Sequence, residues 1–130
     1  MKLLLDTHFL IWLVDGDDQI GARETALLDD AEQLLVSVVS LWELRIKRRT
    51  ERRRGGPART LSPETAIAFC EAAKLTLAAL EPTDVTARLA ADPDNADPFD
   101  EMLLVHAHRL GARLLTRDEK LLGHPLAIGA

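Results

Sequence analysis

The sequence predicts an α/β fold in which a mainly parallel sheet lies between layers of helices. Short apolar segments alternate along the chain with longer segments of helical periodicity, which is the order expected of strands joined by helices. The 130 residues are 47% hydrophobic and 28% charged, a balance typical of a globular protein and unlike that of a disordered chain. We therefore expect one domain over residues 1–130.

The first half of the chain contains two predicted strands. The first apolar run stops at a charged residue, Asp6, as expected of a buried parallel strand. Asp15-Gly16 closes the helix that follows, and apolar residues at helical spacing from Val38 to Ile46 begin a longer helix. We expect strands at 2–5 and 34–37, and helices at 9–14, at 22–31 and from 38 to the break at Gly55-Gly56-Pro57.

The second half repeats the alternation. Pro63 suits the first position of a helix, as does Pro98, and Gly111 suits a left-handed helix end. We expect helices at 63–74, at 84–91 and from 98 to the residue before Gly111, strands at 75–80 and 113–116, and a further edge strand at 125–128.

The distribution of charge is uneven. The whole chain carries a formal charge of −5, yet residues 45–59 hold eight basic residues against one acid, Glu51. A basic segment on an otherwise acidic protein is a plausible contact for nucleic-acid phosphates, although a solvated helix end and loop explains the charge equally well. The candidate RNA-binding residues are Arg45, Lys47, Arg48, Arg49, Arg52, Arg53 and Arg54, here called the basic segment.

The single cysteine limits the possible classes of protein. Cys70 alone provides neither a disulfide framework nor a cysteine-based metal cluster, which indicates a reducing compartment, and we expect the cytoplasm. The apolar run at the N-terminus is too short for a signal peptide or a spanning helix, so we expect no membrane association.

Two acids stand directly after predicted strands. Asp6 follows the first strand and Asp118 follows the late strand in Leu114-Leu115-Thr116-Arg117-Asp118. Parallel sheets place their sites at the carboxyl ends of the strands, so these distant carboxylates could meet at one edge. Alternatively, each begins a turn or caps the next helix.

Two further acidic features have competing interpretations. Glu43 lies in an apolar stretch, where a carboxylate must be paired, protonated or bound to a metal, but it could equally pair with Lys47 four residues on. Asp97 and Asp100 could face one way at the head of a helix. Asp97 is also a suitable N-cap before Pro98, and Asp100 suits the helix dipole.

Together these segments resemble the PIN-domain ribonucleases, and among them the VapC-type toxins of VapBC toxin–antitoxin pairs. The segments are Asp6-Thr7-His8 with Trp12, Ser40-Leu41-Trp42-Glu43 with Lys47, Asp97-Pro98-Phe99-Asp100, and Leu115-Thr116-Arg117-Asp118. Each motif is weak alone, but the four in this order across the chain are fairly specific. The resemblance implies a PIN-like three-layer α/β/α fold, an RNA substrate, a VapB-type antitoxin and a homodimer.

The resemblance also implies a metal-dependent endoribonuclease. Two carboxylates about 4 Å apart repel by about 4 kcal/mol at an effective dielectric of about 20, so an acidic cluster needs a cation, and oxygen ligands suit Mg²⁺ or Mn²⁺. We expect Asp6, Glu43, Asp100 and Asp118 to hold the metal, and Asp97 to be a further catalytic residue. Thr7 and Thr116 would hydrogen-bond the carboxylates or water.

Other interpretations differ in class. A non-catalytic RNA- or protein-binding module would share the fold and the basic segment, whereas a phosphatase of the haloacid dehalogenase type would need an acid where His8 stands. The chain has neither of the glycine patterns that bind nucleotide cofactors. We expect Trp12 and Trp42 to lie in the core or at a dimer interface.

Overall fold

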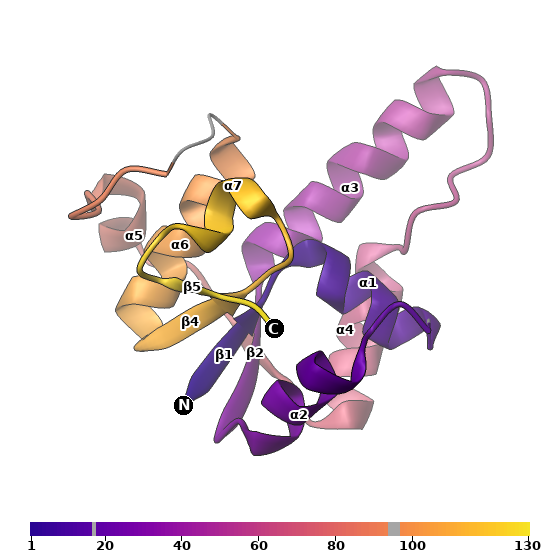
Figure 1. The fold of residues 1–130 in the computed structure, drawn as a ribbon. Helices are drawn as coiled ribbons and strands as arrows, with labels where there is room; N and C mark the ends of the chain where they lie inside the picture. Colours follow the sequence, from indigo (N-terminus) through magenta and orange to yellow (C-terminus); the bar gives the residue numbers. More distant parts are fainter. Residues whose placement is uncertain (17, 94–96) are drawn as a thin grey trace.

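A five-stranded parallel sheet forms the centre of the fold (Figure 1). The structure is a computed structural model that describes residues 1–16, 18–93 and 97–130. The strand order is β3-β2-β1-β4-β5. The strands are β1 (Lys2–Leu5), β2 (Gln33–Ser37), β3 (Thr76–Ala78), β4 (Ala112–Leu115) and β5 (Ala127–Ile128).

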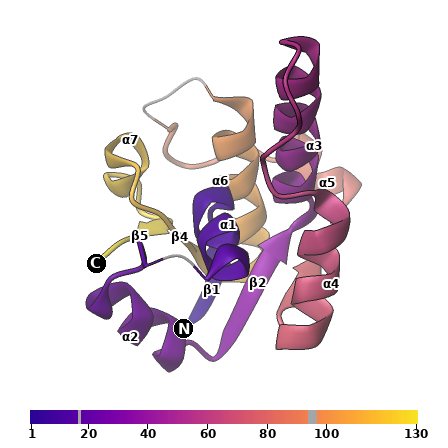
Figure 2. The ribbon, with the colours of Figure 1, turned by 90° about the vertical axis from the view of Figure 1, so that its right-hand side faces the viewer.

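Helices cover both faces of this sheet, which confirms the predicted α/β class. Figure 1 shows α1, α2 and α4 on one side and α5, α6 and α7 on the other. Figure 2 shows that α3 rises from the sheet well beyond its edge. The helices are α1 (Thr7–Asp15), α2 (Ala22–Asp30), α3 (Val38–Arg53), α4 (Pro63–Ala73), α5 (Pro82–Thr86), α6 (Pro98–Leu110) and α7 (Glu119–Leu122).

The strand β1 divides the core into two halves. Alternate side chains of a strand point to opposite faces, so Leu3 and Leu5 pack with Phe9 of α1, while Leu4 packs with Leu103 and Leu104 of α6. All five of these leucines and Phe9 are essentially inaccessible to water. This two-sided burial explains why the strand reads as a continuous apolar run in the sequence.

Several predicted boundaries needed correction. The helix expected at 84–91 begins instead at Pro82 and ends at Thr86, because Pro82 takes the first turn and Ala87 is extended, after which Leu89 packs against the core on the α6 face. The strand expected at 75–80 is β3, which spans only Thr76–Ala78. The helix α7 was not predicted from the sequence; Asp118 caps its N-terminus.

A partly buried polar network joins α5, α6 and the start of α3. Arg109 donates from Nε to both carboxylate oxygens of Asp84, at 2.7 and 2.9 Å, and from Nη2 to the carbonyl of Ala79 at 2.8 Å. His106 Nδ1 lies 2.8 Å from Ser37 Oγ, which also accepts from Val39 N and so caps α3. The network thereby fixes the start of α3, the helix that carries Glu43.

No helix in the described part of the chain is long and apolar enough to cross a membrane.

Cys70 is a free thiol buried in the core between α4 and the sheet, where burial raises its pKa.

Candidate active site at the carboxyl ends of β1 and β4

Asp6 lies at the end of β1, and the residue is 7% exposed. Its Oδ1 accepts from His8 N at 2.6 Å and caps α1, and its Oδ2 accepts from Thr116 Oγ1 at 2.8 Å. Burial raises the pKa of Asp6, but the hydrogen bonds from His8 and Thr116 outweigh burial and lower the pKa below its ordinary value. Asp6 is therefore held as a carboxylate.

Thr116 connects Asp6 to Asp118. Because β1 pairs with β4 and Leu5 stands opposite Leu115, the residues after the two strands are neighbours. The Thr116 hydroxyl donates to Asp6, and its oxygen accepts from Asp118 N at 3.0 Å. Asp118 in turn accepts from Lys120 N at 2.9 Å as the N-cap of α7. Both aspartates line one cavity of about 300 Å³.

Glu43 projects from α3 with its side chain only 13% exposed. Thr7 donates to its Oε1 at 2.8 Å, and Lys47 Nζ lies 3.2 Å from its Oε2. The structure thus contains the Lys47 pair and, in addition, a bond to the residue that follows Asp6. Ser40, one helical turn before Glu43, lies fully buried 2.9 Å from the Thr7 hydroxyl.

Asp97 and Asp100 begin α6. Asp97 Oδ1 accepts from Phe99 N at 2.8 Å and from Asp100 N at 3.2 Å, which is the N-cap geometry expected of it. Asp100 lies in the first turn of the same helix. The described residues that line the cavity of Asp6 and Asp118 include neither of them.

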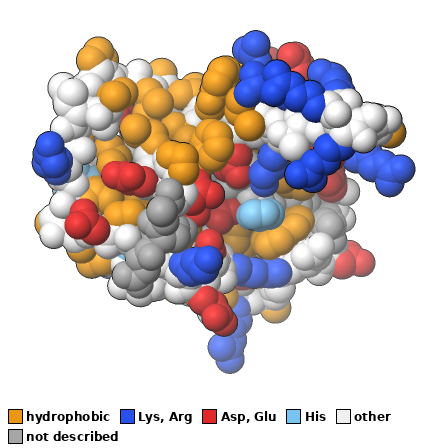
Figure 3. Space-filling model, turned by 90° about the horizontal axis from the view of Figure 1, so that it is seen from above, with side chains coloured by type: hydrophobic (Ala, Val, Ile, Leu, Met, Phe, Trp, Pro, Cys, Tyr) orange, Lys and Arg blue, Asp and Glu red, His pale blue; other side chains and the backbone are white. Residues whose placement is uncertain are grey.

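The predicted acids do not form one compact cluster. Over residues 1–16, 18–93 and 97–130, no three His, Cys, Asp or Glu side chains are grouped closely enough to hold a metal ion between them. Figure 3 nevertheless shows acidic side chains gathered in the middle of one face, with Lys and Arg side chains along the projecting end at one side. Of the predicted acids, Asp6 and Asp118 share a cavity, and Glu43 is hydrogen-bonded to Thr7.

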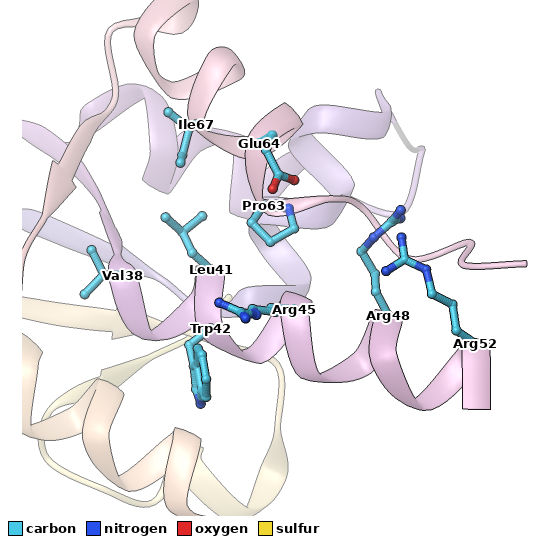
Figure 4. Close-up of a pocket in the computed structure, with 9 residues that line it drawn as sticks. All are labelled: Val38, Leu41, Trp42, Arg45, Arg48, Arg52, Pro63, Glu64 and Ile67. Atoms are coloured by element: carbon cyan, nitrogen blue, oxygen red, sulfur yellow. The ribbon is translucent and has the colours of Figure 1, made fainter. Parts of the chain in front are cut away.

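The basic segment lies on α3 and the turn after it, as predicted. Arg49, Arg52, Arg53 and Arg54 are exposed, whereas Arg48 donates to the carbonyl of Thr60 in the returning loop. Arg45 lies over the ring of Trp42, with Cζ 5.2 Å from the ring centroid. A groove of about 560 Å³ between α3 and α4 is lined by Val38, Leu41, Trp42, Arg45, Arg48, Arg52, Pro63, Glu64 and Ile67 (Figure 4).

Arg117 is a site residue that sequence reasoning missed. Its Nε and Nη2 bind the Glu24 carboxylate at 2.6 and 2.5 Å, and its Cζ lies 4.5 Å from the centroid of the Trp12 ring. The ion pair with Arg117 lowers the pKa of Glu24. The one available signal was its position between Thr116 and Asp118.

A PIN-domain family model matches residues 3–124. The chain belongs to the PIN-domain family. Members of this family related to VapC are generally nucleases. The predicted resemblance to PIN domains is thus confirmed, and so is the fold that it implied. No curated protein matches this PIN domain in sequence.

Solved structures from three bacteria share the fold of this PIN domain. A VapBC2 complex of Rickettsia felis bound to a DNA fragment from its promoter has a TM-score of 0.62 at 13% identity, covering 100% of this chain and 98% of that chain. A DNA-bound VapBC of Salmonella typhimurium has a TM-score of 0.61 at 22% identity, and the match covers 100% of this chain and 97% of that chain. A toxin–antitoxin complex of Klebsiella pneumoniae has a TM-score of 0.59 at 19% identity, and the match covers 97% of this chain and 95% of that chain.

Replacing Thr116 by valine tests the connection between the two aspartates. Thr116→Val keeps the shape but removes the donor to the buried Asp6 carboxylate, so the free energy of unfolding should fall by about 1–3 kcal/mol. Urea unfolding of both proteins measures this. Thr50→Val is the matched control, because the Thr50 hydroxyl bonds a carbonyl on the exposed side of α3 and its loss should cost under about 0.5 kcal/mol. Equal losses in the two variants would show that the Thr116 bond has no special importance.

Proposed function

We propose that this PIN domain is a Mg²⁺-dependent endoribonuclease that hydrolyses RNA phosphodiester bonds, with Mn²⁺ as a possible substitute. The observation that carries the proposal is the shared cavity of Asp6 and Asp118, which joins two carboxylates at adjacent strand ends in a chain of a family that generally contains nucleases. The basic segment beside this face supplies the positive charge that an RNA backbone requires.

The residues at this site fit a magnesium ion. Mg²⁺ keeps several water molecules and binds through one or two carboxylates together with substrate phosphates, so it does not require a closed cage of protein ligands. Asp6 and Asp118 supply two carboxylates at one cavity, and the low pKa of Asp6 keeps its charge available. A bound cation would activate a water molecule and stabilise the negative charge that develops on the attacked phosphate.

The protein side chains orient this chemistry. Thr116 donates to one oxygen of Asp6 and so fixes this carboxylate at the end of β1. Thr7 donates to one oxygen of Glu43 and so fixes that carboxylate on α3. We assign Glu43 and Asp100 as further metal ligands, reached through water where needed, and Asp97 as the residue that orients the first turn of α6. Lys47, paired with Glu43, brings a positive charge to the same region.

We also propose that the protein is the toxin of a VapBC-type pair and acts in the cytoplasm. The proposed partners are an RNA substrate, a VapB-type antitoxin and a second copy of this chain. The groove of Figure 4, with three arginines beside apolar side chains, suits an amphipathic antitoxin segment that carries acids. Trp42, 50% exposed beside Pro98, Phe99 and Met102, gives an apolar surface suited to a homodimer.

The competing proposal is a non-catalytic binding module. The lack of a compact group of three acids in the described part of the chain favours this alternative, and the cavity shared by Asp6 and Asp118 favours the enzyme.

Metal-dependent cleavage decides between these proposals. Purified protein, free of antitoxin, should cut total RNA into discrete fragments with Mg²⁺ and leave it intact with chelator. Asp6→Asn and Asp118→Asn should each abolish cleavage while the protein stays folded, because each removes ligand charge at nearly constant shape. Asp29→Asn, on the exposed side of α2, is the control and should cut at the parental rate. Cleavage that survives chelator or either site variant would refute the proposed site.

The salt dependence of RNA binding tests the basic segment. Changing Arg52, Arg53 and Arg54 together to alanine should weaken binding and reduce the slope of log affinity against log salt by about 2, since fewer counterions are released. Filter binding over a series of salt concentrations measures the slope. The control changes three other exposed arginines, Arg23, Arg88 and Arg113. If both triple variants keep the parental slope, the basic segment does not contact RNA phosphates.

A further inference from the structure

The cavity beside the two aspartates has a second, aromatic wall. The described residues that line its roughly 300 Å³ are Asp6, His8, Phe9, Trp12, Arg117 and Asp118. One part of the lining consists of the carboxylates at the ends of β1 and β4, and the other part consists of α1 side chains together with Arg117. Sequence reasoning placed Trp12 in the core or at a dimer interface. The half-buried Trp12 does pack against the core, and it also borders the candidate active site.

We propose that this cavity binds one nucleobase of the RNA, that of the nucleotide beside the cut phosphate, with Trp12 as its stacking surface. This inference rests on the proposed function, because it takes the phosphate to be bound at Asp6 and Asp118. A base attached to that nucleotide then lies next to the same two carboxylates, which the cavity and the proposed metal site have in common. Trp12 is therefore a substrate-binding residue.

The indole of Trp12 is held in place before any ligand arrives. The buried ring of Phe9 meets it edge to face with centroids 5.0 Å apart. Arg117 lies over it at 4.5 Å, and the Arg117 guanidinium is itself fixed by Glu24. A rigid aromatic surface loses little freedom on binding, so its stacking energy contributes directly to affinity.

His8 completes the aromatic wall. It stands one helical turn before Trp12, the two ring centroids are 6.0 Å apart and the planes are inclined at 36°. The His8 side chain is 60% exposed, so the cavity opens to solvent on this side. An unpaired base of single-stranded RNA can enter from that opening without disturbing the core.

The charges around the cavity favour a base over a phosphate. At the aromatic end of the cavity Glu24 pairs with the guanidinium of Arg117, so among the described lining residues no unpaired Lys or Arg remains to bind a second phosphate. A base carries no net charge, and base–aromatic stacking tolerates any sequence because every base has a π-face. A volume of about 300 Å³ is at the lower end of the range for ligand cavities, which suits a single base.

Tryptophan fluorescence tests the proposal directly, because the chain contains two tryptophans. Trp42→Phe leaves Trp12 as the only tryptophan, and Trp12→Phe leaves Trp42. After rapid mixing with a short single-stranded RNA in Mg²⁺, and before cleavage, the Trp12 emission should be quenched. An abasic ribose-phosphate chain of equal length and charge should not quench it. In Trp12→Phe the emission of Trp42 should not distinguish the RNA from the abasic chain, because Arg45 over its ring meets only the backbone charge that the two probes share.

Cleavage kinetics supply a second measurement on the same RNA. Trp12→Leu should raise KM by about ten-fold through lost stacking, and Trp12→Phe should recover part of that loss, whereas a purely packing role for Trp12 would alter thermal stability without altering KM. Trp42→Leu is the matched control for the loss of an indole and should raise KM less than Trp12→Leu. If Trp12→Leu does not fold, the fluorescence comparison decides alone.

Two results would overturn the proposal without touching the proposed function. One is RNA that the protein cuts in a metal-dependent way while the Trp12 emission stays unchanged. The other is equal quenching by RNA and by the abasic chain, which would assign the cavity to the ribose-phosphate backbone. Quenching by RNA that wild-type protein fails to cut would instead overturn the proposed hydrolysis and leave the base site standing.

Discussion

The parallel pairing of β1 with β4 is the contact on which the candidate site depends. It sets Leu5 opposite Leu115, so that Asp6 receives a hydrogen bond from Thr116 across the two chain segments. A carboxylate on a residue that is 7% exposed would be costly without such donors. The same threonine accepts from Asp118 N, and one hydroxyl group therefore couples both aspartates to the sheet.

The rest of the fold supports this edge from both faces. On one face, Phe9 and Leu10 anchor α1 so that His8 and Trp12 border the cavity. On the other, the Ser37–His106 bond ties the start of α3 to α6, and Arg109 ties α6 to Asp84 of α5. The long α3 then extends away from the sheet (Figure 2), and the groove between α3 and α4 has no described lining residue in common with the cavity at the aspartates.

The local sequence pattern predicted the ends of β1 and β4 and the start of α6, because each depends on neighbouring residues alone. The apolar runs at β1 and β4 marked Asp6 and Asp118 as strand-end residues, and Pro98 with Asp97 marked the start of α6. The pair of Glu43 with Lys47 followed from local spacing, but the hydrogen bond from Thr7 could not be predicted, because Thr7 lies 36 residues away. Likewise, the aromatic wall arises only when Arg117 of the β4–α7 connection folds over Trp12 of α1. The predicted bounds of α5 were wrong because Pro82 takes the first helical position and the backbone is extended at Ala87, while Leu89 beyond the helix packs against the core.

The central claim is that the carboxylates at the ends of β1 and β4 bind the cation used in catalysis. Anomalous diffraction from a crystal of the protein soaked in Mn²⁺ tests it most directly, because the signal locates the ion without reference to activity. The account predicts a peak at coordination distance from Asp6 and within reach, directly or through water, of Asp118. A saturating soak with no peak in that cavity, or with peaks only elsewhere on the protein, would contradict it.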